Sequence, residues 1–395
     1  MVAMGIMNRD PNKLNFLKII KSVILRKEIH IDDLDSFNLE RIIKYAKFHS
    51  LEYITYLGLK QLIIDEEQDI FKTFKKYATI NAYKSLIQDG ELEIVCSELE
   101  HYKIKHMPLK GALIRKLYPD LQYRSMADID ILIPIDDLKK AGNVLKEIGY
   151  TVDNVGGNHD NYIKKPYMNI ELHRGMIDES YGVNYYDNIW DRVKLAENKQ
   201  YSYELSDEDF FVFMIVHAAK HFGHGGTGLR TIIDLYYYLE QKKLDFNYIN
   251  SELKSLELDK FSCTLIAISD YIFKGKIDKI KEEDINLVLN YILECGTYGT
   301  VENSAVNSLE NKDDLEKSKK HLIIKKLFPP FKVMKRRNPI LSKIPILLPW
   351  FWFERLVKGL FNFKTHKRTY QTIQNVNYKK VEEINMIKEI TGVKI

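Results

Sequence analysis

Two acidic residues about a third of the way along the chain have the spacing of a divalent-metal site. Asp128 and Asp130 lie two positions apart in the segment ADIDILI, whose β-branched residues favour a strand. Because successive strand side chains point to opposite faces, both carboxylates should project to one side, with Ile129, Ile131 and Ile133 on the other. Neighbouring carboxylates repel each other, and a bound divalent cation relieves that repulsion. The alternative is a pair of solvated acids at an exposed strand edge.

A third acid repeats the pattern in the later segment MNIELHR. On a strand, Glu171 shares one face with Asn169 and His173, and it joins the two aspartates if this strand lies beside the first. Three carboxylates with room for phosphates suit Mg²⁺ or Mn²⁺ and in-line phosphoryl transfer. Alternatively, Glu171 is a cross-strand partner of Lys164 or Lys165. We expect His173 to support the site rather than to bind metal.

The segment LKGAL, upstream of the acids, combines a cation with a glycine at an expected strand-to-helix junction. Gly111 would let a ligand approach the backbone, helix N-terminal amides attract phosphate, and Lys110 adds a positive charge. Arg124, four residues before Asp128, could make a forked contact with phosphate oxygens. These residues predict a phosphate-binding side to the site.

Two histidines and a lysine lie near the end of a helix that should begin at Ser206. His217 and His221 have the spacing of a zinc pair, but the first lacks the adjacent glutamate of an HExxH motif. Lys220 and His221 precede a glycine-rich segment and could face phosphates, although a solvated helix end would look the same. We expect substrate-side or structural roles for the histidines rather than metal binding.

The elements that must position these residues alternate between strand and helix. Hydrophobic periodicity and turn residues predict strand, helix, strand, helix and then three strands, over 104–109, 111–117, 129–133, 136–149, 150–155, 161–165 and 168–174. This order predicts an α+β fold, in which a small mixed sheet has helices on one face. Apolar residues at helical spacing predict helical flanks before and after it.

The chain of 395 residues is long enough for several lobes. We expect an N-terminal helical region, a mixed-sheet core, a helical region on the substrate and nucleotide side, and a C-terminal basic and aromatic helical region, over 1–100, 101–180, 181–300 and 301–395. Residues 302–318 are polar and should form a connecting segment.

Composition indicates an ordinary globular protein, with 45% hydrophobic and 29% charged residues. The net charge of +4 neither requires nor excludes nucleic acid. Cys96, Cys263 and Cys295 form no CxxC pair, which argues against a disulfide framework and a structural zinc site. With no signal-peptide core and no apolar run near the ~20 residues of a membrane span, we expect a cytoplasmic location.

The C-terminal segment WFWFERLVK concentrates aromatic and basic residues. Trp350 and Trp352, with their neighbours, could form an interfacial membrane helix or could pack back onto the core. We expect packing, no stable membrane insertion, and at most weak peripheral membrane contact.

The stretch LKGALIRKLYPDLQYRSMADIDILI, followed by Gly149-Tyr150 and IELHRGM, resembles the uncharacterised nucleotidyltransferase family of the DNA polymerase beta superfamily. The superfamily pattern of a glycine turn, acid-x-acid on a strand and a third acid on a later strand falls on Gly111, Asp128, Asp130 and Glu171. The turn departs from the usual Gly-Ser or Gly-Gly, because this chain has Lys-Gly-Ala there.

The resemblance implies transfer of a nucleoside monophosphate from an NTP to a hydroxyl or phosphate acceptor, with release of pyrophosphate. In that reading Asp128 and Asp130 hold two Mg²⁺ or Mn²⁺ ions, and Glu171 completes the catalytic metal site and helps deprotonate the acceptor. The residues that would hold the triphosphate are Lys110, Gly111 and Arg124. The acceptor, whether small molecule, protein or nucleic acid, stays open.

A second pair on the following helix also agrees with the family pattern. Arg230 and Asp234 lie four residues apart, which is the spacing of an ordinary helical ion pair. The resemblance implies instead that they brace the nucleotide pocket.

A different class of function is a non-catalytic nucleotide-binding or regulatory module on the same fold, since a fold does not determine an activity. The altered turn at Lys110-Gly111-Ala112 is the feature that favours it. The three acids argue against it, because a binder without chemistry has little use for three converging carboxylates.

Overall fold

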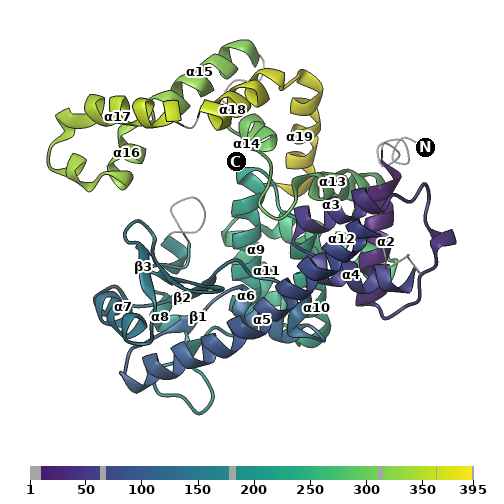
Figure 1. Ribbon diagram of the computed structural model, residues 1–395, viewed down its shortest axis with the longest axis horizontal. Helices are drawn as coiled ribbons and strands as arrows, with labels where there is room; N and C mark the ends of the chain where they lie inside the picture. The colour runs from purple at the N-terminus through teal and green to yellow at the C-terminus, as the bar shows by residue number, and fades with distance from the viewer. Residues whose placement is uncertain (1–9, 63–67, 178–183, 310–314, 362, 394–395) are drawn as a thin grey trace.

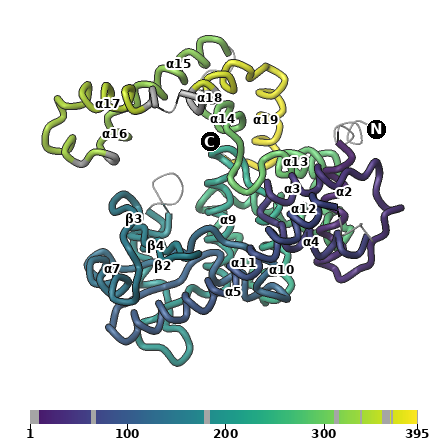
Figure 2. Tube along the Cα trace, viewed as in Figure 1, coloured from purple at the N-terminus to yellow at the C-terminus, as the bar shows by residue number. Residues whose placement is uncertain are grey.

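The computed structural model describes residues 10–62, 68–177, 184–309, 315–361 and 363–393 (Figure 1). Within these ranges, a five-stranded mixed sheet lies beside a larger helical body, from which a helical arm extends (Figures 1 and 2). This is the α+β architecture that the alternating strand and helix patterns predict.

The described part of the N-terminal region consists of helices, as expected. Asp10 caps the first of them by accepting a hydrogen bond from the Asn12 amide, and Asn38 caps another by accepting one from the Arg41 amide. Their apolar faces pack into one core with the later helices of the body. The elements are α2 (Pro11–Ile24), η1 (Ile31–Asp33), α3 (Leu39–His49), α4 (Glu52–Gln61) and α5 (Asp69–His101).

The sheet follows, in the spatial order β1-β2-β5-β4-β3, with β2 and β5 parallel and the other neighbours antiparallel. The first strand is shorter than the sequence predicts, because only two of its residues pair with β2. The elements are β1 (Met107–Pro108), α6 (Gly111–Ile114), η2 (Arg115–Leu117), η3 (Leu121–Tyr123), β2 (Ile129–Leu132), η4 (Ile135–Asp137), α7 (Leu138–Glu147), β3 (Thr151–Asn154), β4 (His159–Lys164) and β5 (Met168–His173).

One face of the sheet is apolar and is covered by α5 and α7 (Figure 1). Alternation along β2 and β5 turns Ile129, Ile131, Ile170 and Leu172 to this face and the acids to the other. The buried residues that form this second core include Val95, Leu99, Ile129, Ile131, Val144, Leu145, Ile170 and Leu172. The helices therefore cover the face that carries the isoleucines, and the acids lie on the opposite face.

The rest of the body is again helical. Ser206 caps α9 by accepting a hydrogen bond from the Asp209 amide, as the sequence indicates. The predicted polar connection over 302–318 is partly wrong, since α14 forms there with Ala305 and Val306 buried in the body. The elements are η5 (Asn184–Tyr186), α8 (Ile189–Arg192), β6 (Lys194–Leu195), β7 (Tyr203–Glu204), α9 (Asp207–His224), α10 (Leu229–Gln241), α11 (Phe246–Ser255), α12 (Asp259–Lys274), α13 (Glu282–Cys295), α14 (Val301–Asn307), α18 (Phe363–Asn375) and α19 (Tyr378–Thr391).

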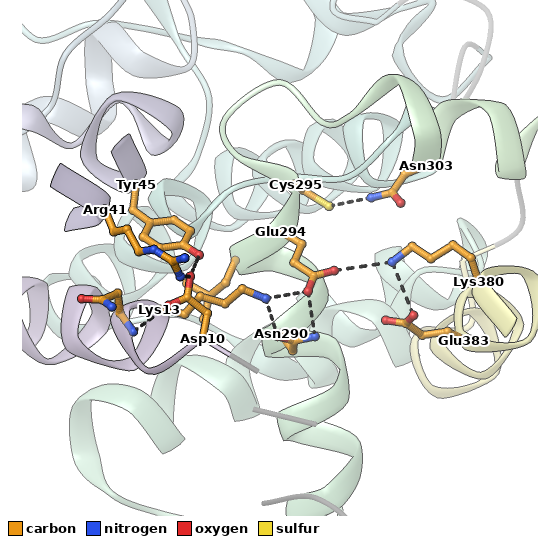
Figure 3. Close-up of polar contacts among 12 residues, drawn as sticks. Asp10, Lys13, Arg41, Tyr45, Asn290, Glu294, Cys295, Asn303, Lys380 and Glu383 are labelled. Atoms are coloured by element: carbon orange, nitrogen blue, oxygen red, sulfur yellow. Dashed lines mark hydrogen bonds and ion pairs between the residues drawn. The ribbon is translucent and has the colours of Figure 1, made fainter. Parts of the chain in front are cut away.

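Both ends of the described chain are tied to α13 by one carboxylate (Figure 3). Glu294 accepts a hydrogen bond from Lys13 of α2 at 2.5 Å and lies 3.5 Å from Lys380 of α19. Lys380 also pairs with Glu383 of its own helix. Helices α2 and α19 therefore belong to the same body. The chain leaves this body after α14, forms the arm, and returns to the body at α18.

The arm consists of α15 (Leu315–Leu327), α16 (Phe331–Arg337), η6 (Pro339–Ser342), η7 (Pro345–Leu347) and α17 (Leu348–Phe361). The start of α15 is anchored in the body core through Leu315 and Leu322, and the remainder projects outward (Figure 1). The expectation that both C-terminal tryptophans pack onto the core is wrong for Trp350, whose side chain is 62% exposed, because α17 lies on the arm rather than on the body. Among the described residues, no helix is both long and apolar enough to cross a bilayer.

A buried histidine in the body leads to a prediction about acid stability. His49 is fully buried, accepts a hydrogen bond from the Leu229 amide at Nδ1 and donates from Nε2 to the Leu293 carbonyl at 3.1 Å. Burial lowers its pKa to about 4, below the unfolded value near 6.5. The unfolded state therefore binds the extra proton first, and stability is lost as the pH falls from about 6.5 towards 4.

We expect this residue to account for about 2–3 kcal/mol of that loss. Unfolding by urea, measured across this pH range for the wild type and for His49→Gln, tests the expectation. The wild type should lose more stability on acidification than the glutamine variant does. Parallel curves for the two proteins would contradict it.

Candidate active site

Strand register brings the predicted acids together. β2 and β5 are parallel neighbours, and Asp130 is paired directly with Glu171. Asp128 immediately precedes β2, two residues before Asp130, and lines the same cavity. That cavity has a volume of about 330 Å³ and lies between the polar face of the sheet and helices α9 and α10. Residues from two separate segments thus form a single acidic cluster.

The three acids differ in how their charge is compensated. Asp130 is buried and accepts hydrogen bonds from Lys110 Nζ at 2.9 Å and from His173 Nε2 at 2.6 Å. Burial alone would raise the pKa of Asp130, but Lys110 and His173 together hold it well below its usual range. For Asp128, burial and then the charges of Asp130 and Glu171 raise the pKa. Of the three acids, Asp128 is therefore the one whose ionised form is least stabilised by the protein and would gain most from a bound cation.

Two histidines beside Glu171 extend the set of metal-binding atoms. His173 Nε2 lies 3.1 Å from Glu171 Oε2, and His159 Nδ1 of β4 lies 3.5 Å from the same oxygen. The hydrogen bond from His173 lowers the pKa of Glu171. One ligand atom from each of the three residues can lie within 4.8 Å of the others, a spacing that suits a metal ion.

The sequence interpretation did not single out His159. The expected two-residue turn at Pro166-Tyr167 would pair Lys165 with Met168, and therefore His159 with Arg174. In the structure Lys164 pairs with Met168, so the register is shifted by one residue and His159 lies opposite His173 and beside Glu171. The expected turn alone therefore did not reveal this histidine.

The alternative interpretation of Glu171 as a partner of the hairpin lysines does not match the structure. Lys164 pairs with Glu91 of α5, 2.9 Å away, on the other side of the sheet. Asn161 is the residue of β4 opposite Glu171. The Glu171 carboxylate therefore belongs to the cavity.

Helix α9 supplies the second wall of the cavity, including the two residues for which the sequence suggested a phosphate-facing position. Lys220 and His221 line the cavity together with His217. The Nε2 atoms of the two histidines lie 3.1 Å apart. Burial, reinforced by nearby cations, lowers the pKa of both, that of His221 to about 4. The imidazoles are neutral at pH 7, so they can contact a ligand by hydrogen bonding rather than by charge.

Helix α10 contributes a buried charge pair. Arg124 makes a forked contact with Asp234, from Nε to Oδ1 at 2.7 Å and from Nη2 to Oδ2 at 2.8 Å. Tyr118 donates a further hydrogen bond to Asp234 at 2.6 Å. Arg124 therefore contacts the cavity from a fixed position, with its fork engaged by protein. Arg230 donates to the Ser125 carbonyl at 3.1 Å and also lines the cavity.

The Lys-Gly-Ala turn has an unusual backbone. Lys110 has a backbone φ of +49°, a positive value that residues other than glycine rarely adopt. The conformational need for glycine thus falls on position 110, where this chain has a lysine that reaches Asp130.

Gly111 has a packing role that the sequence did not suggest. A Cβ at Gly111 would lie 2.3 Å from Arg124 Nη1 and 2.8 Å from Met126 Sδ. The absent side chain therefore makes room for the buried guanidinium. Helix α6 is a single turn, so its dipole contributes little to anion binding.

Comparison with known protein families bears on this arrangement. The profile of the uncharacterised nucleotidyltransferase family matches residues 35–274. The chain belongs to this family. The match spans the sheet, the acidic cluster and both helices that face it, and it ends before α13 and the arm. Comparisons with curated proteins and with solved structures gave no match.

Proposed function

We propose that this nucleotidyltransferase-family protein moves a nucleoside monophosphate from an NTP to a hydroxyl or phosphate acceptor in a Mg²⁺- or Mn²⁺-dependent reaction that releases pyrophosphate. The observation that carries the proposal is the direct pairing of Asp130 with Glu171 on parallel strands. Asp128 lies beside them in a cavity that is also lined by lysine and arginine side chains. Clustered carboxylates facing phosphate-binding cations suit phosphoryl transfer.

The residues present fit divalent metal ions. Asp128, Asp130 and Glu171 supply the hard oxygen ligands that Mg²⁺ and Mn²⁺ prefer. Burial, and then repulsion from Asp130 and Glu171, raises the pKa of Asp128, and a bound cation would offset both effects. His159 could add a nitrogen ligand, which Mn²⁺ accepts more readily than Mg²⁺. Bound metal would neutralise charge on the phosphates during transfer.

The protein groups can then be given roles in the reaction. The acceptor oxygen attacks the α-phosphorus, the bond from that phosphorus to the bridging oxygen breaks, and pyrophosphate leaves with the bonding electrons. Glu171, kept ionised by the hydrogen bond from His173, accepts the proton of the attacking hydroxyl.

On the phosphate side, four cavity residues could contact the triphosphate. Lys110, Lys220 and Arg230 line the cavity as cations, and His221 can donate a hydrogen bond. The forked contact of Arg124 with Asp234 holds helix α10 in place against this side of the cavity. In this proposal, contacts from the four cavity residues to the triphosphate take the place of the contact that the serine of the superfamily turn usually makes.

A single substitution tests the metal site. Asp128→Asn should weaken Mg²⁺-dependent NTP binding by about tenfold to a hundredfold, the loss expected for one charge-assisted contact. Calorimetric titration of NTP with and without Mg²⁺ measures this. Asp136→Asn, an exposed acid on η4, is the matched control and should bind normally.

The same substitution has a second readout that does not depend on the ligand. Because burial and like charges raise the pKa of Asp128, its ionised form destabilises the metal-free protein near neutral pH. Asp128→Asn should therefore keep or raise the midpoint of unfolding without metal. An unchanged NTP affinity, or a clear loss of stability, would rule out the metal assignment.

A further inference from the structure

The outer part of the arm, residues 324–358, has an exposed apolar stripe. On α17, Trp350, Phe353 and Val357 are spaced three and four residues apart and are 62%, 59% and 38% exposed. Ile346, in the turn before α17, is 84% exposed. Residues at this spacing share one helix face, and the rings of Trp350 and Phe353 lie 6.1 Å apart. An isolated apolar side chain would be ordinary, but a continuous apolar face marks an interaction surface.

The stripe is held outward by contacts on the opposite face of α17. Trp352 donates a hydrogen bond from Nε1 to the Pro329 carbonyl at 2.9 Å, and its ring packs edge-on against Phe328. Trp352 lies two positions from Trp350, about half a turn around the helix. The orientation of α17 on the arm is therefore fixed by packing, and this packing presents Trp350 and Phe353 to solvent.

The arm is also strongly basic. Residues 324–358 contain six lysines and three arginines against one glutamate, a formal charge of +8. The whole chain has a charge of +4, so the remainder sums to −4. Exposed lysines such as Lys326, Lys335 and Lys343 lie on the same projecting segment as the stripe. The family match ends at residue 274, so the arm is additional to the matched region.

We propose that the arm docks on an anionic membrane surface, with Trp350 and Phe353 at the headgroup boundary and the lysines beside the lipid charges. A cationic segment with an aromatic and aliphatic face has the chemistry of an interfacial membrane anchor. The aliphatic members Ile346 and Val357 favour lipid over nucleic acid, because bases stack on aromatic rings and gain little from branched aliphatic chains. The proposal goes beyond our expectation from the sequence of at most weak peripheral membrane contact.

Vesicle cosedimentation of the full chain tests the proposal. At about 0.15 M salt, the protein should bind vesicles of phosphatidylcholine with phosphatidylglycerol at least about tenfold more strongly than vesicles of phosphatidylcholine alone. The double substitution Trp350→Ala with Phe353→Ala should reduce this binding by about tenfold or more. Lys335→Glu with Lys343→Glu should reduce it by a similar factor.

A matched control removes exposed apolar side chains elsewhere. The variant with Tyr83→Ala and Ile135→Ala changes residues outside the arm that are 60% and 69% exposed, and it should bind vesicles as the wild type does. Equal binding to both vesicle types, or undiminished binding by the Trp350 and Phe353 variant, would overturn the proposal. So would tight binding of single-stranded oligonucleotide that vesicles do not displace, which would make the arm a nucleic-acid surface.

Discussion

Glu171→Gln should reduce nucleotidyl transfer by about a thousandfold while leaving NTP affinity within a few-fold of the wild type. The substitution keeps the shape of the side chain and removes the charge that accepts the acceptor proton. Removing such a proton acceptor typically costs 10²–10⁴-fold in rate, so we expect turnover to fall by about a thousandfold. Pyrophosphate release and NTP affinity would be measured on the same preparation with Mg²⁺ or Mn²⁺.

The control for this prediction is Glu91→Gln, which removes the same charge from α5. Glu91 pairs with Lys164 and accepts a hydrogen bond from Tyr150, and it is not part of the cavity lining. Its variant should turn over at the wild-type rate. Wild-type turnover by Glu171→Gln would remove the catalytic role, and no turnover by the wild type with any NTP and cell extract would favour a non-catalytic binding module.

Asp234→Ala should produce the largest loss of stability among single substitutions at the site. The change leaves the buried Arg124 guanidinium without its forked partner and leaves the Tyr118 hydroxyl without its acceptor. Removing one member of a buried ion pair typically costs about 3–5 kcal/mol. Urea unfolding measures the free energy, and Asp209→Ala, whose partner Arg192 is more exposed, should cost less.

A double variant separates stability from binding. Arg124→Met with Asp234→Leu replaces the pair by apolar side chains and should recover most of the lost stability. If Arg124 also contacts the triphosphate, this variant should be stable yet bind NTP about tenfold or more weakly. Normal NTP affinity in it would restrict Arg124 to a structural role. Failure of the double variant to regain stability would contradict the ion-pair argument.

Much of the sheet follows from local sequence patterns. The period-two alternation in ADIDILI and MNIELHR predicts two strands with acids on one face, and β2 and β5 form there with Ile131 and Leu172 in the core. The capping serine before α9 and the helical periodicity of α10 also locate those helices. These features depend on neighbours in the sequence, which is why the sequence reveals them.

Other features of the site depend on residues that are far apart along the chain. Asp234 pairs with Arg124 rather than with Arg230 on its own helix, and the need for a small residue at Gly111 arises from that same Arg124 side chain. Neither fact leaves a periodic signal, because each results from the way α10 packs against the turn. Lys110 likewise has a positive φ, although the sequence interpretation placed the glycine of the turn at Gly111.

By itself the sequence determined the α+β class, the family, and the three acids, because strand alternation and motif spacing are local properties of the chain. Tertiary structure alone decided that Asp130 is neutralised by both Lys110 and His173, and that His159 lies beside Glu171. It also decided that Trp350 faces solvent. An aromatic segment has the same sequence whether it packs in a core or lies on an arm. Only the packing of α17 against Phe328 and Pro329 determines which of its faces is left exposed.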